Sequence, residues 1–137
     1  LPLRLKQQMA NAAALADQLA DHAMVNWVRY PHRSDHPQHQ VASRQMSAGG
    51  AIVTVSFNAS QEQTYALCKQ LRWFIMAESL GGIESLICHP ATMTHAAVST
   101  EVKAKLGIDD GLVRFSVGCE DLADLQADLE QALELLA

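Results

Sequence analysis

Arg114, an arginine inside an apolar segment, is the residue of this sequence best placed to bind a ligand. Arg114 lies between Val113 and Phe115 in residues 112–117, where apolar side chains alternate as in a half-buried strand. The face formed by Val113, Phe115 and Val117 must pack on helices, so Arg114 is expected to point away from that core. Its planar guanidinium matches a carboxylate through two parallel hydrogen bonds. The pattern alone favours a surface salt bridge, and it leaves a carboxylate site open as the alternative.

Two polar segments offer further ligand contacts. Residues 78–82 read Glu-Ser-Leu-Gly-Gly, and a glycine pair lets the backbone approach a ligand closely, although sharp turns have the same composition. Thr94 follows Pro90 in a stretch with few core positions. Polar loop residues are functional more often than core residues are, but most of them only make turns. On pattern alone, Glu78, Ser79 and Thr94 are therefore weak candidates.

A metal centre and a nucleophilic thiol are also conceivable. The metal-ligand candidates are histidines and one cysteine: His32, His36, His39, Cys88 and His89. Their spacing matches no zinc pattern and no cysteine pair supports one, which favours polar histidines around a loop and a helix start. Cys119 has no activating base nearby in the sequence, which disfavours a nucleophilic role.

The apolar periodicity predicts the elements that must position these residues. The expected helices cover residues 5–22, 38–45, 60–71, 99–106 and 121–136, and the expected strands cover residues 24–30, 51–57, 73–76, 84–88 and 112–117. Ser60 and Gln63 form a capping-box signature, and Ser99 and Asp121 are suited to cap later helices. Pro37 suits the first turn of the second helix.

This order of elements predicts an α+β fold, a small and mostly antiparallel sheet covered on one face by helices. No repeat or linker divides the sequence, so residues 1–137 are expected to form a single domain. A formal net charge of −5 with scattered basic residues argues against nucleic acid as a partner. No apolar stretch approaches the length of a membrane span. Three widely spaced cysteines suggest no disulfide framework, so a cytoplasmic location is expected.

A series of short motifs runs along the chain in a fixed order. AESLGGIESL at 77–86 is followed by HPATMTHA at 89–96, LGI at 106–108, GLVRFSVG at 111–118 and Glu120-Asp121; upstream lie LPLR at 1–4, YP at 30–31, HPQH at 36–39 and RQM at 44–46. In this order the motifs closely resemble the C-terminal domain of the Cys/Met-metabolism pyridoxal-phosphate (PLP) enzyme family, of the cystathionine γ-synthase and γ-lyase type. The resemblance covers essentially the whole chain, and several linked motifs make it specific.

The resemblance implies roles for four residues and the C-terminal domain of a fold-type I PLP enzyme as the fold. Arg114 matches the arginine that holds the α-carboxylate of an amino-acid substrate. Ser79 matches a residue beside that carboxylate and the cofactor-bearing lysine, and Thr94 matches a threonine that lines the pocket. Glu78 matches an acidic residue of the γ-synthase and γ-lyase branch, where it can meet the amino group of a second amino acid or help set γ over β chemistry.

The resemblance also implies what this chain lacks. In the family, the lysine that forms a Schiff base with PLP, the aspartate that pairs with the pyridine nitrogen and the phosphate-binding residues all lie upstream of the position of Leu1. Lys6, Lys69, Lys103 and Lys105 match none of them. We therefore expect no catalytic residue in this chain and PLP only in the full-length enzyme, whose large PLP-binding domain is absent here. The first residue, which is not methionine, also favours a fragment.

The activity implied by the resemblance belongs to the full-length protein, a PLP-dependent transferase or lyase that makes or breaks carbon–sulfur bonds on homoserine esters or cystathionine. The expected partners are the amino-acid substrate, the large PLP domain of the same enzyme and further copies in a homo-oligomer, with neither nucleic acid nor membrane. The chain alone is expected to be inactive. The alternatives are a methionine γ-lyase or sulfhydrylase activity of the full protein, a non-catalytic truncated module for folding or interaction, and a metal-binding module built on the histidines.

Overall fold

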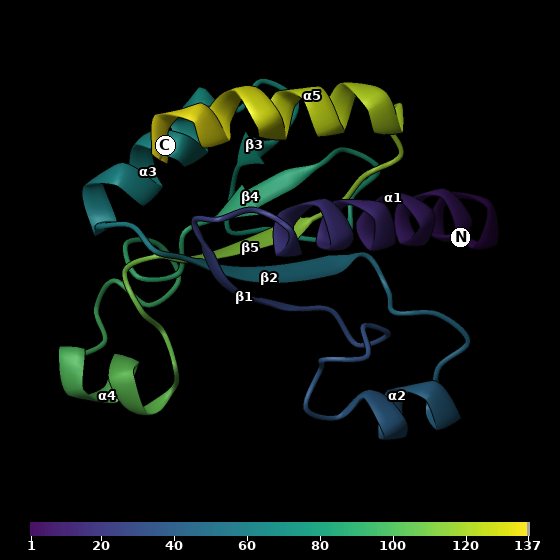
Figure 1. Cartoon of the computed structure of the whole chain (residues 1–137), viewed down its shortest axis with the longest axis horizontal. Coiled ribbons are helices and arrows are strands. Elements are labelled where there is room, and N and C mark those ends of the chain that lie inside the picture. The colour runs from purple at the N-terminus through teal and green to yellow at the C-terminus, as the bar shows by residue number, and fades with distance from the viewer. Residues whose placement is uncertain (137) are drawn as a thin grey trace.

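A computed structural model describes residues 1–136, which form a sheet and its covering helices (Figure 1). The helices are α1 (Pro2–Ala20), α2 (His39–Gln45), α3 (Gln61–Gln70), α4 (Thr100–Lys105) and α5 (Leu122–Leu133), the last continued by a 3-10 turn, η1 (Glu134–Leu136). The strands are β1 (Val25–Arg29), β2 (Ile52–Phe57), β3 (Ile75–Met76), β4 (Leu86–Cys88) and β5 (Leu112–Ser116).

The sheet has five strands in the order β1-β2-β5-β4-β3. The β1–β2, β2–β5 and β5–β4 pairs are antiparallel, and β3 pairs with β4 in parallel. The expected α+β fold with a mostly antiparallel sheet is thus confirmed. The strand that carries Arg114, β5, is the middle strand, so this side chain projects from the centre of the sheet and not from an edge.

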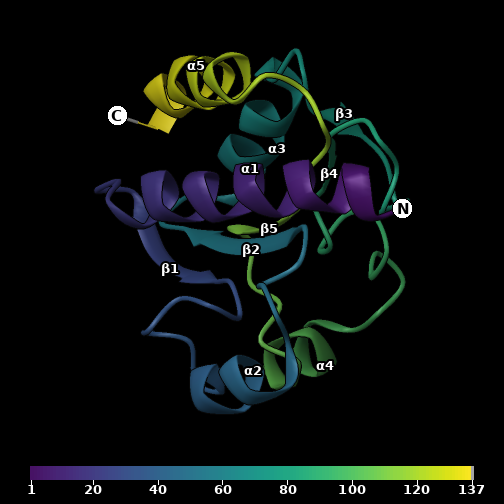
Figure 2. The same ribbon diagram turned by 90° about the vertical axis from the view of Figure 1, so that its right-hand side faces the viewer.

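The helices divide between the two sides of the sheet. Figures 1 and 2 both show α1, α3 and α5 packed over one face, while α2 and α4 stand away from the opposite side on long connections. The expected helical cover on one face therefore comes from the three long helices. None of the helices within residues 1–136 is long and apolar enough to cross a lipid bilayer.

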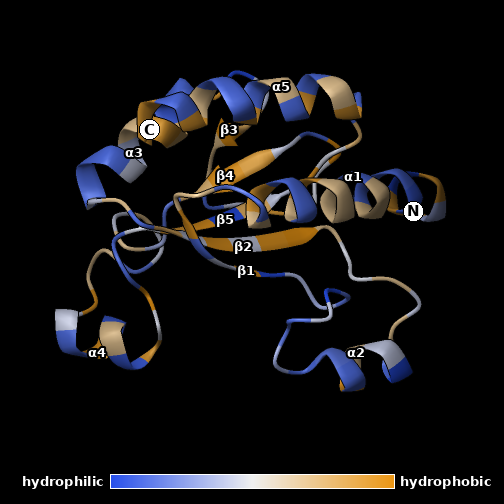
Figure 3. Cartoon of the chain, in the orientation of Figure 1, coloured by the Kyte–Doolittle hydropathy of each residue, from blue (hydrophilic) through white to orange (hydrophobic). Residues whose placement is uncertain are grey.

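The core lies between the sheet and α1, α3 and α5. The strand residues on this face and the helix residues that meet them form one buried apolar cluster, which includes Val53, Val55, Phe57, Val113, Phe115 and Val117 from the sheet with Leu15, Leu19, Leu67, Leu125 and Leu129 from the helices. Figure 3 shows β2, β4 and β5 largely in the hydrophobic colour, with β2 directly beneath α1. Burial of this surface is the main force that holds the helices on the sheet.

The predicted helix starts are confirmed by their capping contacts. The Ser60 hydroxyl accepts from the Gln63 backbone N–H at 3.3 Å, and the Gln63 side chain accepts from the Ser60 backbone N–H at 3.0 Å. Ser99 and Asp121 cap α4 and α5 in the expected way. The second helix differs in detail, because its cap is Gln38 and Pro37 precedes the helix.

The strand expected at residues 73–76 is shorter than predicted. Only Ile75–Met76 pair with a neighbour, because a side chain of α5 takes the earlier backbone donors. The buried Asp128 carboxylate accepts from the Arg72 backbone N–H at 2.9 and 3.0 Å and from the Trp73 backbone N–H at 2.8 Å. Hydrogen bonds to the Asp128 side chain thus take the place of the strand hydrogen bonds that the local sequence favours.

Candidate functional site

Arg114 projects from β5 on the face opposite the helix-covered core. Its neighbours along the strand, Val113 and Phe115, are 0% and 1% exposed within that core, whereas Arg114 itself is half-buried. Thr54 on β2 and Cys88 on β4 are its partners across the sheet. The side-chain orientation predicted from the strand alternation is therefore confirmed.

The guanidinium of Arg114 is held on one side and unpaired on the other. Its Nη2 donates to the Glu78 carbonyl at 3.0 Å and to the Ser79 carbonyl at 3.3 Å. Its Nε is buried and has no hydrogen-bond partner among residues 1–136. A buried donor without an acceptor is costly, and an acceptor from outside the chain reaches this shielded Nε only if the side chain or the loop shifts. A planar carboxylate pairs with a guanidinium edge through two parallel hydrogen bonds.

The segment that meets the guanidinium is the 77–85 loop, which joins the parallel strands β3 and β4. Parallel neighbours usually need a connection of about a dozen residues or more, so this loop must double back tightly. Gly81 adopts φ +79°, a conformation that favours glycine, and its N–H donates to the Ser116 hydroxyl at 2.9 Å. Ser116 lies two residues after Arg114, so both side chains project from the same face of β5. That face therefore carries both the contact that fixes the loop and the arginine.

The four candidate site residues are not all brought together. The backbone carbonyls of Glu78 and Ser79 contact Arg114, while both of their side chains lie in an exposed loop. Thr94 lies in an exposed turn, and its hydroxyl pairs with the His95 ring at 2.8 Å. Within residues 1–136 no hydrogen bond connects Thr94 to Arg114 or to the loop.

The turn that carries Thr94 is attached to the sheet through His89, the residue that follows β4. The buried His89 ring pairs with the Thr92 hydroxyl at 2.8 Å and with the Asp110 carbonyl at 2.9 Å. Both ring nitrogens are thus engaged, which accounts for His89 as a structural residue. The metal cluster considered from the sequence has no counterpart, because no group of three or more potential ligands occurs among the described residues.

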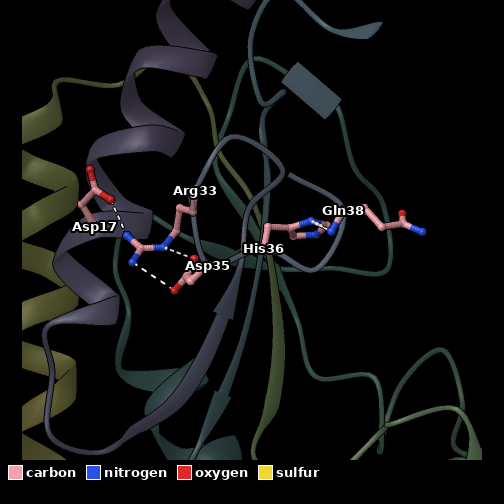
Figure 4. Close-up of polar contacts among 5 residues, drawn as sticks. All are labelled: Asp17, Arg33, Asp35, His36 and Gln38. Carbon is pink, nitrogen blue, oxygen red and sulfur yellow. Dashed lines mark hydrogen bonds and ion pairs between the residues drawn. The ribbon is translucent and has the colours of Figure 1, made fainter. Parts of the chain in front are cut away.

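The histidines of the 31–39 segment belong to a surface connection. Figure 4 shows Arg33 between Asp17 of α1 and Asp35, with which it forms ion pairs, and His36 accepting from the Gln38 backbone N–H. The hydrogen bond from Arg33 lowers the pKa of Asp35 below its usual value. These contacts fasten the loop to α1.

A buried polar group near the loop was not anticipated from the sequence. Gln8 and Asn11 of α1, each 1% exposed, and Ser85, 0% exposed, lie among apolar core residues. Their one sequence signal is that Gln8 and Asn11 share the buried face of α1 with apolar residues such as Leu15 and Leu19. Neither position has a motif that indicates a partner, since the partners lie far along the chain.

Cys68 is an unreactive thiol by its surroundings. Burial raises its pKa to about 12, with a further contribution from Cys88. The unfolded thiol loses its proton near its ordinary pKa of 9.0, whereas the folded one keeps it, so deprotonation favours unfolding. We expect the free energy of unfolding to fall between about pH 9 and 12, by at most about 1.4 kcal/mol per pH unit from this group. Urea unfolding of Cys68→Ala should show a shallower loss over the same range, and identical slopes would contradict the assignment.

The structure defines an α+β domain in which Arg114 projects from the middle strand, away from the helix-covered core. The sequence pattern of the family described as Cys/Met metabolism PLP-dependent enzyme matches residues 1–134. The chain belongs to this family. A cystathionine gamma-synthase of Mycobacterium tuberculosis is 50% identical over 133 residues, which are 97% of this chain and 34% of the relative. A cystathionine gamma-lyase of Dictyostelium discoideum is 45% identical over 98% of this chain and 35% of its own length.

A solved structure carries the same fold. The cystathionine gamma synthase of Xanthomonas oryzae pv. oryzae, in complex with cystathionine, superposes with a TM-score of 0.92 at 45% identity, over 98% of this chain and 35% of that one. The chain thus spans about a third of the length of the relatives it matches. The likeness extends over nearly every described element.

The family uses PLP, and covalent attachment of PLP needs a lysine amine. The lysines of this chain do not fit that role. Lys103 donates to the Ala91 carbonyl at 2.8 Å, and the Lys69 amine lies 5.5 Å from the Tyr65 ring centroid. Lys6 and Lys105 are exposed on α1 and α4. Among residues 1–136 no hydrogen bond joins a lysine to the 77–85 loop.

Proposed function

We propose that this chain is the C-terminal domain that binds the substrate carboxylate in a PLP-dependent trans-sulfuration enzyme of the cystathionine γ-synthase or γ-lyase type. The observation that carries the proposal is Arg114, whose Nη2 is held by two loop carbonyls while its buried Nε has no acceptor in the described chain. The names of the relatives, which are trans-sulfuration enzymes, support the same assignment.

The role of Arg114 is to bind and to orient. A carboxylate paired with two guanidinium donors is fixed in both position and plane. An α-amino acid held in this way has its Cα bonds in a defined direction, which lowers the entropic part of the barrier. PLP bound in the rest of the enzyme supplies the electron sink for cleavage at these bonds. Ser79 lies beside the carboxylate in this proposal, and Thr94 lines the pocket once the remaining domain is in place.

Glu78 is the residue that we assign to the choice of reaction. Its backbone carbonyl holds Arg114, and its carboxylate lies exposed, where it can meet the amino group of a second amino acid. An anionic group at that place favours a substrate with a distal ammonium, such as cystathionine. Relatives named L-methionine gamma-lyase and O-succinylhomoserine sulfhydrylase, at 43% and 40% identity, define the competing reactions.

The test is a set of product assays on the full-length enzyme with PLP. The expected result is formation of cystathionine from an activated homoserine ester and cysteine, or cleavage of cystathionine at its γ-carbon. Sulfide in place of cysteine and methionine in place of cystathionine serve as competing substrates. An enzyme that binds PLP, as its absorbance shows, but makes or breaks no carbon–sulfur bond would overturn the proposal.

The chain by itself is expected neither to bind PLP tightly nor to catalyse, because its lysines lie on helices and no hydrogen bond within residues 1–136 joins one of them to the 77–85 loop. After PLP is added and the chain is separated from free cofactor, the protein fraction should lack the near-ultraviolet and visible absorbance of a lysine–PLP adduct. Reduction with borohydride followed by mass spectrometry should find no specifically modified lysine. One stoichiometrically modified lysine would contradict the expectation.

The proposal includes the partners that complete the site. Residues 1–137 form the small domain, a large PLP-binding domain of the same enzyme lies against it, and copies of the enzyme assemble as a homo-oligomer in the cytoplasm. Exposed apolar side chains near the loop support such a cover: Ile75, Leu80 and Ile83 are 57%, 54% and 61% exposed. Exposed large apolar side chains on one loop and on the strand before it are typical of an interaction surface.

A further inference from the structure

The C-terminal end of the 77–85 loop is joined to the segment that follows β5 by a hydrogen-bonded pair, Ser85 and Glu120. The Glu120 carboxylate accepts from the Ser85 backbone N–H at 2.6 Å and from the Ser85 hydroxyl at 2.8 Å. The same hydroxyl accepts from the Gly118 backbone N–H at 2.9 Å. These contacts form a closed ring in which one residue uses both backbone and side chain. Hydrogen bonds to a carboxylate are the stronger kind.

Amide side chains of α1 also hydrogen-bond to the loop and to the segment that follows β5. The Gln8 amide donates to the Gly82 carbonyl at 2.6 Å and to the Val117 carbonyl at 3.1 Å. The Asn11 amide donates to the Gly118 carbonyl at 3.2 Å and to the Glu120 carbonyl at 2.9 Å. Helix α1, the loop and the end of β5 are therefore joined by polar contacts at one point.

The backbone approach at this point leaves no room for a side chain. A Cβ at Gly118 would lie 2.5 Å from the Ile83 carbonyl oxygen and 2.6 Å from the Glu84 carbonyl carbon. The Cys119 backbone N–H donates to the Ile83 carbonyl at 2.8 Å. The loop and residues 118–119 are thus in direct backbone contact, so a small shift at Ser85 must move the loop.

Hydrogen bonds, and not apolar packing, set the position of the loop within this chain. Its two large apolar side chains, Leu80 and Ile83, are more than half exposed and lie outside the core. The N-terminal end of the loop supplies the Glu78 and Ser79 carbonyls that hold Arg114. Loss of the hydrogen bonds at Ser85 is therefore transmitted along the loop backbone to the Glu78 and Ser79 carbonyls, which orient the guanidinium.

We propose that Ser85 and Glu120, supported by Gln8, are positioning residues for the carboxylate site, acting on Arg114 through the 77–85 loop. This inference rests on the proposed function of Arg114 and adds the residues that set its direction. Neither Ser85 nor Glu120 touches the substrate. Their loss lowers the affinity for the carboxylate of an amino acid and leaves the affinity for an amine unchanged.

The experiment is a binding cycle on the full-length, PLP-loaded enzyme, read by titration calorimetry. The probe is glycine, and methylamine is the matched ligand without a carboxylate. Ser85→Ala and Glu120→Gln are expected to weaken glycine binding about threefold to tenfold each, as befits the loss of one or two hydrogen bonds, with methylamine binding unchanged. Gln8→Ala should act in the same direction from another element. Ser60→Ala, which removes the α3 cap far from the loop, controls for a general loss of stability.

The decisive comparison is made in an Arg114→Lys background, which keeps a charge and a measurable affinity but loses the planar fork. There, Ser85→Ala is expected to change glycine binding by less than about twofold, because the two residues act as one unit. Equal weakening in both backgrounds, or folded Ser85 and Glu120 variants that bind glycine like the wild type, would overturn the inference while leaving the role of Arg114 intact. An Arg114→Ala variant that binds glycine normally would overturn the proposed function itself, and this inference with it.

Discussion

Replacing Arg114 with alanine in the full-length enzyme is expected to raise the KM for the amino-acid substrate far more than it lowers kcat. The substitution removes the guanidinium that the loop carbonyls hold in place, and it leaves the substrate carboxylate without a charged partner. Loss of one partner from such a pair costs about 2–5 kcal/mol, which corresponds to a rise of roughly 30-fold to several-thousand-fold. Steady-state kinetics with the substrate identified by the product assays measure this directly.

Two further variants separate the possible causes of such a loss. Arg114→Lys keeps the charge but not the fork, so a bidentate role predicts that it recovers only a small part of the affinity. Arg72→Ala removes an arginine from an exposed position beside α5 and should leave KM unchanged. Unchanged KM and kcat in Arg114→Ala would exclude the carboxylate assignment. A loss of kcat alone would instead indicate an interaction made only in the transition state.

The sequence predicts those parts of the structure whose signals are local. The caps at Ser60, Ser99 and Asp121 are read from residues within one turn of each helix, and the alternation around Arg114 shows which face it occupies. These features need no knowledge of distant partners. For the same reason the order of helices and strands along the chain could be predicted. The order of the strands across the sheet, β1-β2-β5-β4-β3, depends on long-range pairing and could not.

The features that the sequence missed all depend on residues far apart in the chain. Asp128 meets Arg72 and Trp73 across more than fifty residues, and Gln8 meets Gly82 and Val117 across still more. A polar residue on an apolar helix face signals that a partner exists, but it does not say which one. The pocket role of Thr94 has the same limit, because within residues 1–136 its only hydrogen bond is local. Its place in a pocket depends on chain beyond this domain, as the proposed function has it.

Asp128 is the side chain whose removal should cost the fold most among the polar residues. Asp128 is 4% exposed, and its carboxylate accepts from the Arg72 and Trp73 backbone N–H groups at the turn between α3 and β3. These donors belong to a segment that makes no strand ladder. Alanine at this position leaves them without an acceptor in a place where water has little access. Hydrogen bonds to a charged group contribute about 1.5–3 kcal/mol each, so the expected loss is about 2–4 kcal/mol after partial relaxation.

Urea unfolding of the chain followed by circular dichroism measures this loss as a fall in the midpoint at unchanged slope. Asp128→Asn should fall between alanine and the wild type, because the amide keeps one acceptor but presents its own donors toward the backbone N–H groups. Asp124→Ala, an exposed substitution in the first turn of the same helix, should cost less than about 1 kcal/mol. If Asp128→Ala and Asp124→Ala lowered the midpoint equally, the effect would come from the charge at the start of α5. A clear excess for Asp128 identifies the carboxylate as the contact that holds the backbone just before β3, the strand from which the 77–85 loop departs.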